Sequence, residues 1–229
     1  MNNKVLNILL CNDDGYNAQG IQLLYKKLQK YGNVYICAPE HHMSGKSCSI
    51  SIGQPLKVVQ YDEKIFSVNG TPADACAIGL NTLGVKFDLV VSGCNAGLNV
   101  SYDTIYSGTI GVCLEALRYR TPAVAFSCDF NFEIVDKYFD EVMEFILKQE
   151  RSLDYLYNVN FPNGEVVKEI KFGKLYYRND KPIFEQRDGL WYAERIVDED
   201  IPEGDYDCYQ VTHDIVSVVK LSKTYFHEN

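Results

Sequence analysis

Two adjacent aspartates, Asp13 and Asp14, directly follow the first apolar segment of the chain, residues 5–11. A run of Leu and Ile ended by polar residues and Gly is typical of a buried parallel strand. Ligands of open α/β sheets bind beyond the carboxyl ends of such strands. Two carboxylates placed side by side there repel each other unless a cation or a shared proton relieves the repulsion. The pair therefore predicts either a cation site or two solvated loop acids.

Two further loops rich in small and oxygen-bearing residues follow later predicted strands, at residues 43–49 and 92–99. If the three strands are neighbours, their loops meet at one edge of the sheet. Carboxylate, amide and hydroxyl oxygens suit Mg²⁺ or Mn²⁺ better than zinc, which prefers His and Cys. This ligand chemistry predicts a site for one divalent cation per subunit, made by Asp13, Asp14, Ser44 and Asn95.

A predicted helix start at residues 107–109 adds the features of an anion site. Gly93, Gly97 and Gly108 let the backbone approach a ligand closely. The amides of Ser107, Gly108 and Thr109 favour negative charge through the helix dipole. A metal beside an anion cradle predicts a phosphate ester as the ligand.

Each of these residues also has an ordinary structural interpretation. Asn95 and Asn99 are common types in turns, and a hydroxyl at a helix start such as Ser107 is usually an N-cap. The paired loop histidines, His41 and His42, are more typical of exposed side chains than of general acids. The joint occurrence of these signals after three successive predicted strands is what favours a site.

The composition restricts the class of partner and the compartment. The chain has 229 residues, a hydrophobic content of 46%, a net charge of −9 and a pI near 4.9. This balance argues against a nucleic-acid surface, because that affinity rests on neutralising phosphates with Lys and Arg. The eight cysteines are scattered without a CxxC pair, and we see neither a membrane span nor a signal-peptide pattern. We therefore expect a cytoplasmic protein that does not engage a membrane.

Strands and helices alternate through the first two-thirds of the chain. Strands are predicted at 5–11, 34–38, 87–92 and 122–127, helices at 19–31, 72–83, 107–119 and 134–148, and a hairpin at 56–68. This order predicts an α/β fold, a three-layer, Rossmann-like, mostly parallel sheet. From about Leu153 the segments become short, aromatic and β-like. We therefore expect an α/β catalytic core at 1–150 and a β-rich C-terminal arm or oligomerisation segment at 151–229, packed on the core.

At these residues the sequence resembles the SurE family, the survival-protein nucleotidases. Five motifs carry the resemblance in order: residues 8–15 with the acidic turn, 38–47 with SGKS, 68–74 with GTPAD, 88–99 with DLVVSGCNAGLN, and 106–109 with YSGT. The resemblance implies Asp13, Asp14, Ser44 and Asn95 as metal ligands. It also implies that the phosphate lies at Asn99, Ser107, Gly108 and Thr109. In this family the C-terminal arm is exchanged between subunits of dimers or tetramers.

The resemblance implies a metal-dependent phosphohydrolase that acts on nucleoside 5′- and 3′-monophosphates, with Asp13, Asp14 and Asn95 as catalytic residues. We expect a metal-activated water to attack a phosphoryl group held by Asn side chains and helix amides. Direct attack by an aspartate is the other route. The rival from another class is a receiver-like metal-binding signalling module without phosphatase activity. Such a module carries a second Asp where this chain has Asn95, and Asp88 is expected at the opposite edge of the sheet.

Overall fold

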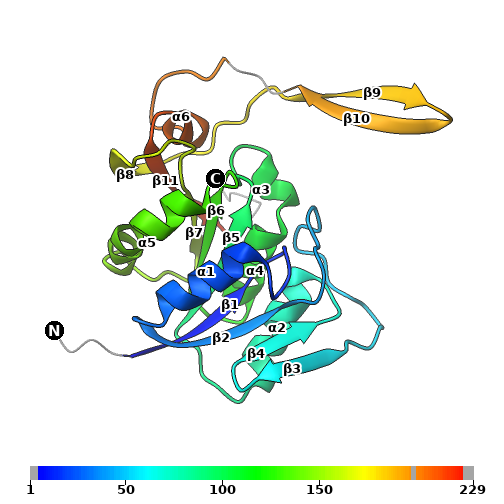
Figure 1. Cartoon of the computed structure of the whole chain (residues 1–229), viewed down its shortest axis with the longest axis vertical. Helices are drawn as coiled ribbons and strands as arrows, with labels where there is room; N and C mark the ends of the chain where they lie inside the picture. Colours follow the sequence, from blue (N-terminus) through cyan, green and yellow to red (C-terminus); the bar gives the residue numbers. More distant parts are fainter. Residues whose placement is uncertain (1–4, 197–199, 224–229) are drawn as a thin grey trace.

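The computed structural model describes residues 5–196 and 200–223, and within them a nine-stranded sheet forms the centre of the molecule (Figure 1). The strand order is β3-β4-β2-β1-β5-β6-β7-β11-β8. The bounds are β1 (Leu6–Cys11), β2 (Gly32–Pro39), β3 (Val58–Asp62), β4 (Ile65–Val68), β5 (Leu89–Ala96), β6 (Ala123–Cys128), β7 (Tyr155–Asn160), β8 (Glu169–Gly173) and β11 (Ile215–Ser222). Only the β3–β4 and β7–β11 pairs of this sheet are antiparallel. The predicted mostly parallel α/β sheet is confirmed.

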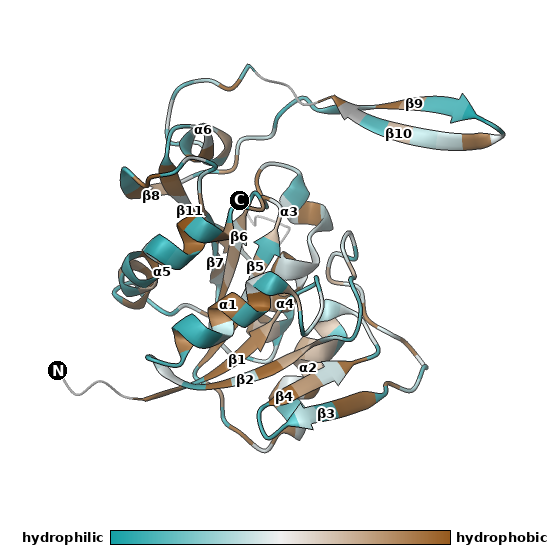
Figure 2. Ribbon diagram, in the orientation of Figure 1, coloured by the Kyte–Doolittle hydropathy of each residue, from teal (hydrophilic) through white to brown (hydrophobic). Residues whose placement is uncertain are grey.

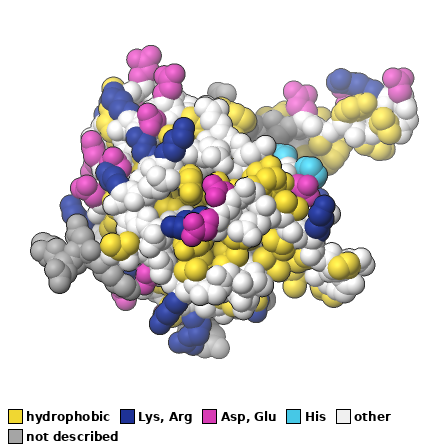
Figure 3. Space-filling view, turned by 60° about the horizontal axis from the view of Figure 1, so that its bottom comes forward, with side chains coloured by type: hydrophobic (Ala, Val, Ile, Leu, Met, Phe, Trp, Pro, Cys, Tyr) yellow, Lys and Arg dark blue, Asp and Glu magenta, His cyan; other side chains and the backbone are white. Residues whose placement is uncertain are grey.

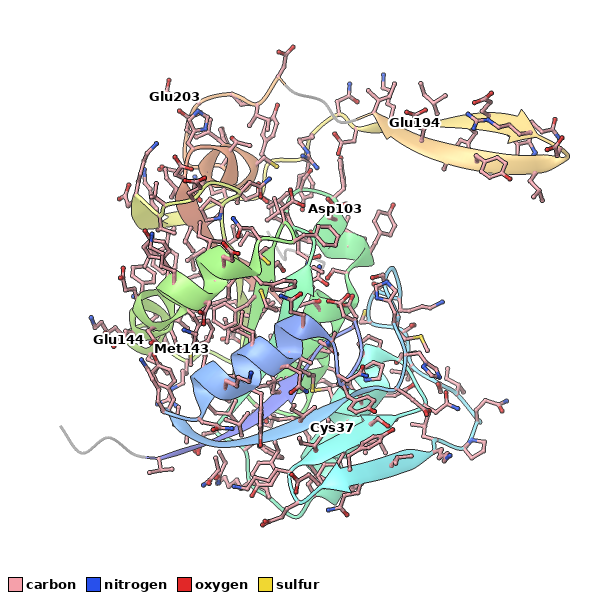
Figure 4. The ribbon with its side chains drawn as sticks, viewed as in Figure 1. Cys37, Asp103, Met143, Glu144, Glu194 and Glu203 are labelled. Carbon is pink, nitrogen blue, oxygen red and sulfur yellow. The ribbon has the colours of Figure 1, made fainter. Side chains whose placement is uncertain are left out.

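Helices cover both faces of the sheet. Their bounds are α1 (Gln19–Leu28), α2 (Pro72–Thr82), α3 (Asp103–Tyr106), α4 (Gly108–Arg118), α5 (Phe132–Leu147) and α6 (Asp207–Thr212). One apolar core lies between the sheet and α1 with α5, and a second lies between the sheet and α2 with α4. Figure 2 shows the brown, hydrophobic segments of the central strands enclosed by these helices. In Figure 4, Met143 on α5 belongs to the first core and Cys37 on β2 to the second.

The predicted start of α2 is confirmed in detail. The hydroxyl of Thr71 accepts a 3.1 Å hydrogen bond from the amide of Asp74, and the Asp74 carboxylate accepts from the amide of Thr71 at 3.0 Å. This reciprocal capping box satisfies two amides that a helix start otherwise leaves unpaired, and Pro72 occupies the first helical position.

The neighbours of β1 decide where the functional loops meet. β1 pairs in parallel with β2 on one side and with β5 on the other. The carboxyl ends of these three strands therefore lie side by side, as the convergence of the loops requires. From β1 the chain continues to β2 on one side, and from β5 it continues to β6 on the other side. The gap between β1 and β5 is therefore the topological switch point, at which α/β sheets bind ligands.

The chain after residue 150 contributes to two structures. β7, β11 and β8 extend the central sheet, whereas β9 (Lys181–Arg187) and β10 (Leu190–Ile196) form a separate antiparallel hairpin that projects from the body (Figure 1). The hairpin exposes six large hydrophobic side chains: Ile183, Phe184, Leu190, Trp191, Tyr192 and Ile196. Figure 3 shows yellow, hydrophobic atoms on the projecting part of the molecule. The division into a core at 1–150 and an arm at 151–229 stays a prediction. No helix within the described residues has the length and hydropathy needed to cross a bilayer.

Candidate active site

The acidic turn after β1 lies against the start of α4. Asp13 is buried, and its Oδ1 accepts a 2.7 Å hydrogen bond from the hydroxyl of Thr109. A Cβ placed on Gly108 would lie 2.8 Å from Cβ of Asp13, so only glycine lets the helix start come this close. The side chain of Asn12 closes the turn, because it donates to the carbonyl of Gly15 at 2.8 Å and accepts from its amide at 3.2 Å.

The surroundings of Asp13 disfavour its negative charge. Burial raises its pKa to about 6, the neighbouring charge of Asp14 adds to the rise, and the hydroxyl of Thr109 partly offsets it. A cation in contact with this carboxylate would reverse the imbalance, because an opposite charge nearby favours the ionised form. The electrostatics of the turn therefore suit a bound cation.

The loop after β5 contributes an amide beside Asp14. The Asp14 Oδ2 accepts a 3.2 Å hydrogen bond from the amide of Ala96, which brings this loop onto the acidic turn. The side-chain nitrogen of Asn95 donates to the carbonyl of Gly97 at 2.8 Å. This bond fixes the side-chain rotamer of Asn95 and leaves its Oδ1 as the acceptor end of the amide.

The loop that carries Ser44 connects the acidic turn to α3. The amide of Met43 donates to the carbonyl of Asp13 at 2.7 Å, so Ser44 follows a residue anchored on the turn. Further on, the amide of Ser47 donates to the carbonyl of Tyr106 at 2.9 Å. Ser44 itself is exposed between these two anchors. The structure thus brings its loop to the same edge of the sheet as the two aspartates.

One contact at this edge was missed by the sequence analysis. His42 is exposed, as expected for a loop histidine, yet its Nδ1 lies 3.2 Å from Oδ1 of Asp14. The sequence signal was the position of His42 two residues before Ser44, within the same loop. Its short distance to Asp14 depends on how that loop folds back onto the turn.

The predicted phosphate-binding residues differ in what they contact. Ser107 is the N-cap of α4, because its Oγ accepts a 3.2 Å hydrogen bond from the amide of Ile110. Thr109 uses its hydroxyl on Asp13 rather than as a cap. Asn99 is buried and donates from its side chain to Oγ of Ser127 at 2.8 Å.

The side chains at this edge fit a hard divalent cation. Asp13 and Asp14 bring carboxylate oxygens, Asn95 brings an amide oxygen, and Ser44 brings a hydroxyl. Mg²⁺ and Mn²⁺ prefer all-oxygen sets of this kind. Within the described residues, no group of three or more His, Cys, Asp or Glu side chains is arranged to hold a metal ion.

Fold and site together define a class: a doubly wound α/β protein with an acidic pair and a helix start at the switch point of its sheet. A family model described as Survival protein SurE matches residues 8–181. The chain belongs to the SurE family, which confirms the resemblance drawn from its motifs.

Individual relatives support the same assignment. The chain is 35% identical over 234 residues to a 5′-nucleotidase SurE of Clostridium botulinum (strain 657 / Type Ba4), covering 94% of this chain and 92% of that protein. It is 36% identical to a 5′-nucleotidase SurE of Actinobacillus succinogenes, with the same coverage. The crystal structure of the SurE protein from Aquifex aeolicus superposes with a TM-score of 0.86 at 31% identity, over 96% of this chain and 95% of that one.

These findings rule out the receiver-like alternative, because the curated relatives are described as nucleotidases and the match covers 92% of each of them. The position of Asp88 points the same way. Its carboxylate accepts a 3.0 Å hydrogen bond from the amide of Asn7 near the beginning of β1, at the edge of the sheet opposite to Asp13.

Proposed function

We propose that this chain is a divalent-metal-dependent phosphohydrolase that releases phosphate from nucleoside 5′- and 3′-monophosphates. Its family membership makes it an enzyme of the nucleotidase type, a phosphoric monoester hydrolase. The observation that carries the finer proposal is the contact of Asp13 with Thr109, because it joins a cation-binding turn to a helix start suited to a phosphate.

The proposed metal ligands are Asp13, Asp14, Asn95 and Ser44, with Mg²⁺ or Mn²⁺ as the cation. When bound, such an ion neutralises charge on a phosphoryl oxygen and makes a bound water molecule more acidic. Thr109 holds Asp13 in place, and the amide of Ala96 holds Asp14. Each aspartate therefore already accepts a hydrogen bond that stabilises it as an anionic ligand.

The proposed phosphate site is the start of α4 together with Asn99. The first amides of a helix have no acceptor within the helix, and they carry its positive dipole end. Those of Gly108 and Thr109 lie next to Asp13, where the contact at Gly108 allows no side chain. They would stabilise charge on the equatorial phosphoryl oxygens during transfer.

We propose water rather than an aspartate as the nucleophile. Both oxygens of Asp14 have partners, the amide of Ala96 and the ring of His42. One oxygen of Asp13 is held by Thr109, and the other is the one proposed to bind the cation. A carboxylate that attacks phosphorus needs a free, correctly aimed oxygen. Reductive trapping with borohydride during turnover would capture an aspartyl phosphate, and we expect none.

We further propose a homodimer or homotetramer in which the C-terminal arm is exchanged, as in the family that the chain resembles. The exposed apolar residues of the β9–β10 hairpin support this, because patches of this kind commonly mark protein–protein contacts. The eight cysteines are free and seven of them are buried, which supports a reducing cytoplasm.

The proposed activity is tested by phosphate release from 5′-AMP and 3′-AMP. Metal-stripped protein is assayed alone and with Mn²⁺ or Mg²⁺ added back, beside an Asp13→Asn protein. We expect release that depends on the metal and is lost in the variant. Release that is independent of both the metal and Asp13 would overturn the proposed site, and no release from either nucleotide would overturn the proposed substrate class.

A further inference from the structure

The backbone of Asn99 is held by side chains of β7 rather than by another backbone strand. The amide of Asn99 donates to Oδ1 of Asn160 at 2.8 Å, and Nδ2 of Asn160 donates back to the carbonyl of Asn99 at 3.1 Å. One side-chain amide therefore satisfies both backbone groups of Asn99. Nδ2 of Asn158 adds a second bond to the same carbonyl at 2.8 Å.

The side chain of Asn99 is fixed from the neighbouring strand. Its Nδ2 donates to Oγ of Ser127 at 2.8 Å, and Ser127 lies in register with Asn160 where β6 pairs with β7. Backbone and side chain of Asn99 are thus both set by the carboxyl ends of β6 and β7. An Asn amide has a second N–H, which stays available to another acceptor.

The burial of Asn158 and Asn160 indicates that their side chains hold the loop of Asn99 rather than pack in the apolar core. Asn158 and Asn160 are fully buried. Side chains alternate between the faces of a strand, and the intervening Val159 belongs to the apolar core against α1 and α5. Polar side chains at the two alternate positions are costly to bury unless they are hydrogen-bonded. The bonds that Asn160 makes go to Asn99.

We propose that Asn160, assisted by Asn158, is a positioning residue that sets the place of Asn99 at the phosphate site. This proposal rests on the proposed function, in which Asn99 faces the phosphoryl group. Asn160 does not touch the substrate. It acts by fixing the peptide of Asn99, so that the remaining N–H of the Asn99 side chain meets a phosphoryl oxygen without a search through other conformations.

The two aspartates of the proposed metal site have anchors other than this contact. Asp13 is held by Thr109, and Asp14 by the amide of Ala96. The far side of the Asn99 loop has its own anchor, because the amide of Ser101 donates to the carboxylate of Asp207 at 2.8 Å. Loss of the Asn160 side chain is therefore expected to loosen Asn99 while the cation site and the rest of the loop keep their partners.

The test compares Asn160→Ala with Ser217→Ala. Ser217 lies in register with Asn160 on β11 and is equally buried, and its hydroxyl has no hydrogen-bond partner in the described part of the chain. It is thus a matched control for loss of a buried polar side chain. Three quantities are measured: hydrogen exchange of the Asn99 amide in metal-free protein, Mn²⁺ affinity by calorimetry, and inhibition of AMP hydrolysis by inorganic phosphate.

For Asn160→Ala we expect the Asn99 amide to exchange roughly 10 to 100 times faster, because its acceptor is gone. We expect the phosphate inhibition constant and the KM for AMP to rise roughly 10- to 100-fold, the range typical for loss of a residue that orients a ligand-contacting one. Mn²⁺ affinity should stay unchanged. Ser217→Ala should match the wild type in all three measurements.

A fall in Mn²⁺ affinity as large as the rise in KM, or an unchanged rate of hydrogen exchange at the Asn99 amide, would overturn the positioning role. If Asn160→Ala does not fold, Asn160→Asp has the same shape and keeps the acceptor for the Asn99 amide while losing the donor to its carbonyl. Exchange of the Asn99 amide is then expected to change little, because its acceptor remains, while KM rises, because the Asn99 carbonyl loses a donor; a wild-type KM would overturn the proposal. Failure of the wild type to release phosphate would refute the proposed function instead, and the exchange comparison would still decide whether Asn160 holds Asn99.

Discussion

The hydroxyl of Thr109 donates a 2.7 Å hydrogen bond to Oδ1 of Asp13, which joins the first turn of α4 to the acidic turn after β1. Both residues are buried. The bond fixes which oxygen of Asp13 faces the helix and leaves the other for a ligand. It is the direct link between the two halves of the proposed site, the metal side and the phosphate side.

We predict that Thr109→Val weakens Mn²⁺ binding roughly tenfold, because valine keeps the shape and removes the hydrogen bond that orients Asp13. Calorimetric titration of stripped protein measures this. Thr82→Val is the control, since the Thr82 hydroxyl donates to the carbonyl of Ile78 within α2, on the surface. Equal Mn²⁺ affinity in both variants would show that Thr109 does not orient the ligand.

The second prediction concerns Asp74, which anchors a functional loop. Its carboxylate accepts from the amide of Thr71 at 3.0 Å and from the hydroxyl of Ser51 at 2.7 Å, and the hydroxyl of Thr71 donates to the carbonyl of Ser49. Burial alone would raise the pKa of Asp74, yet these hydrogen bonds outweigh it and lower the pKa below its ordinary value.

A folded-state pKa below the unfolded one means that the stabilisation is fully present above the unfolded pKa of about 3.9, and is lost as the pH falls through the folded value. We therefore expect Asp74→Asn to lower the free energy of unfolding by about 2 kcal/mol at pH 7, and by progressively less as the pH falls below about 3.9. Urea unfolding across this pH range measures the difference. Asp62→Asn, in the exposed strand β3, should show no such trend. A difference that is independent of pH would contradict the assignment.

The third prediction uses Trp191, the single tryptophan of the chain, which is exposed on the β9–β10 hairpin. If the hairpin packs on another subunit, the fluorescence emission of Trp191 is blue-shifted in the oligomer. On dilution the emission should move to the red as the mass measured by light scattering falls. Phe184 pairs with Ala193 across the hairpin, and Ala193 lies two residues after Trp191 on the same strand. Phe184 and Trp191 therefore lie on the same face of the hairpin. Phe184→Asp should favour the monomer and shift the emission to the red.

Glu185→Ala on the other face of the hairpin is the control and should leave the mass unchanged. An exposed-tryptophan spectrum with a monomeric mass at every concentration would refute the oligomer. The contact at the base of the hairpin is not altered by either variant. There Arg178 lies 3.2 Å from Asp180 and 3.7 Å from Asp103, which Figure 4 labels on α3.

Local sequence chemistry predicted much of this molecule. The start of α2 at Pro72 was predicted, because the signals for it are local: the two hydrogen bonds of the Thr71 and Asp74 capping box are made within one turn. The alternation of strands and helices predicted the mostly parallel sheet, whereas the adjacency of β1, β2 and β5 was only a condition of the predicted site, which the structure meets. The approach of Asp13 to Thr109 was expected only in general terms, as loops meeting at one edge of the sheet.

Other features depend on contacts between distant parts of the chain. Asn160 and Asn99 meet only after β7 has joined β6, and no spacing rule connects them. The strand β9 was not predicted, because every residue of it is exposed and the pattern of alternating burial is missing. The short helices α3 and α6 contain too few turns to show helical periodicity.

The central claim is that Asp14 and its neighbours form one cation site that serves phosphate release. The most direct test titrates Mn²⁺ into stripped wild-type, Asp14→Asn and Asp88→Asn proteins and measures phosphate release from 5′-AMP by the same samples. We predict that affinity and turnover fall together by roughly 100-fold or more in Asp14→Asn. Asp88→Asn, at the opposite edge of the sheet, should keep both. Unchanged Mn²⁺ affinity and turnover in Asp14→Asn would contradict the account.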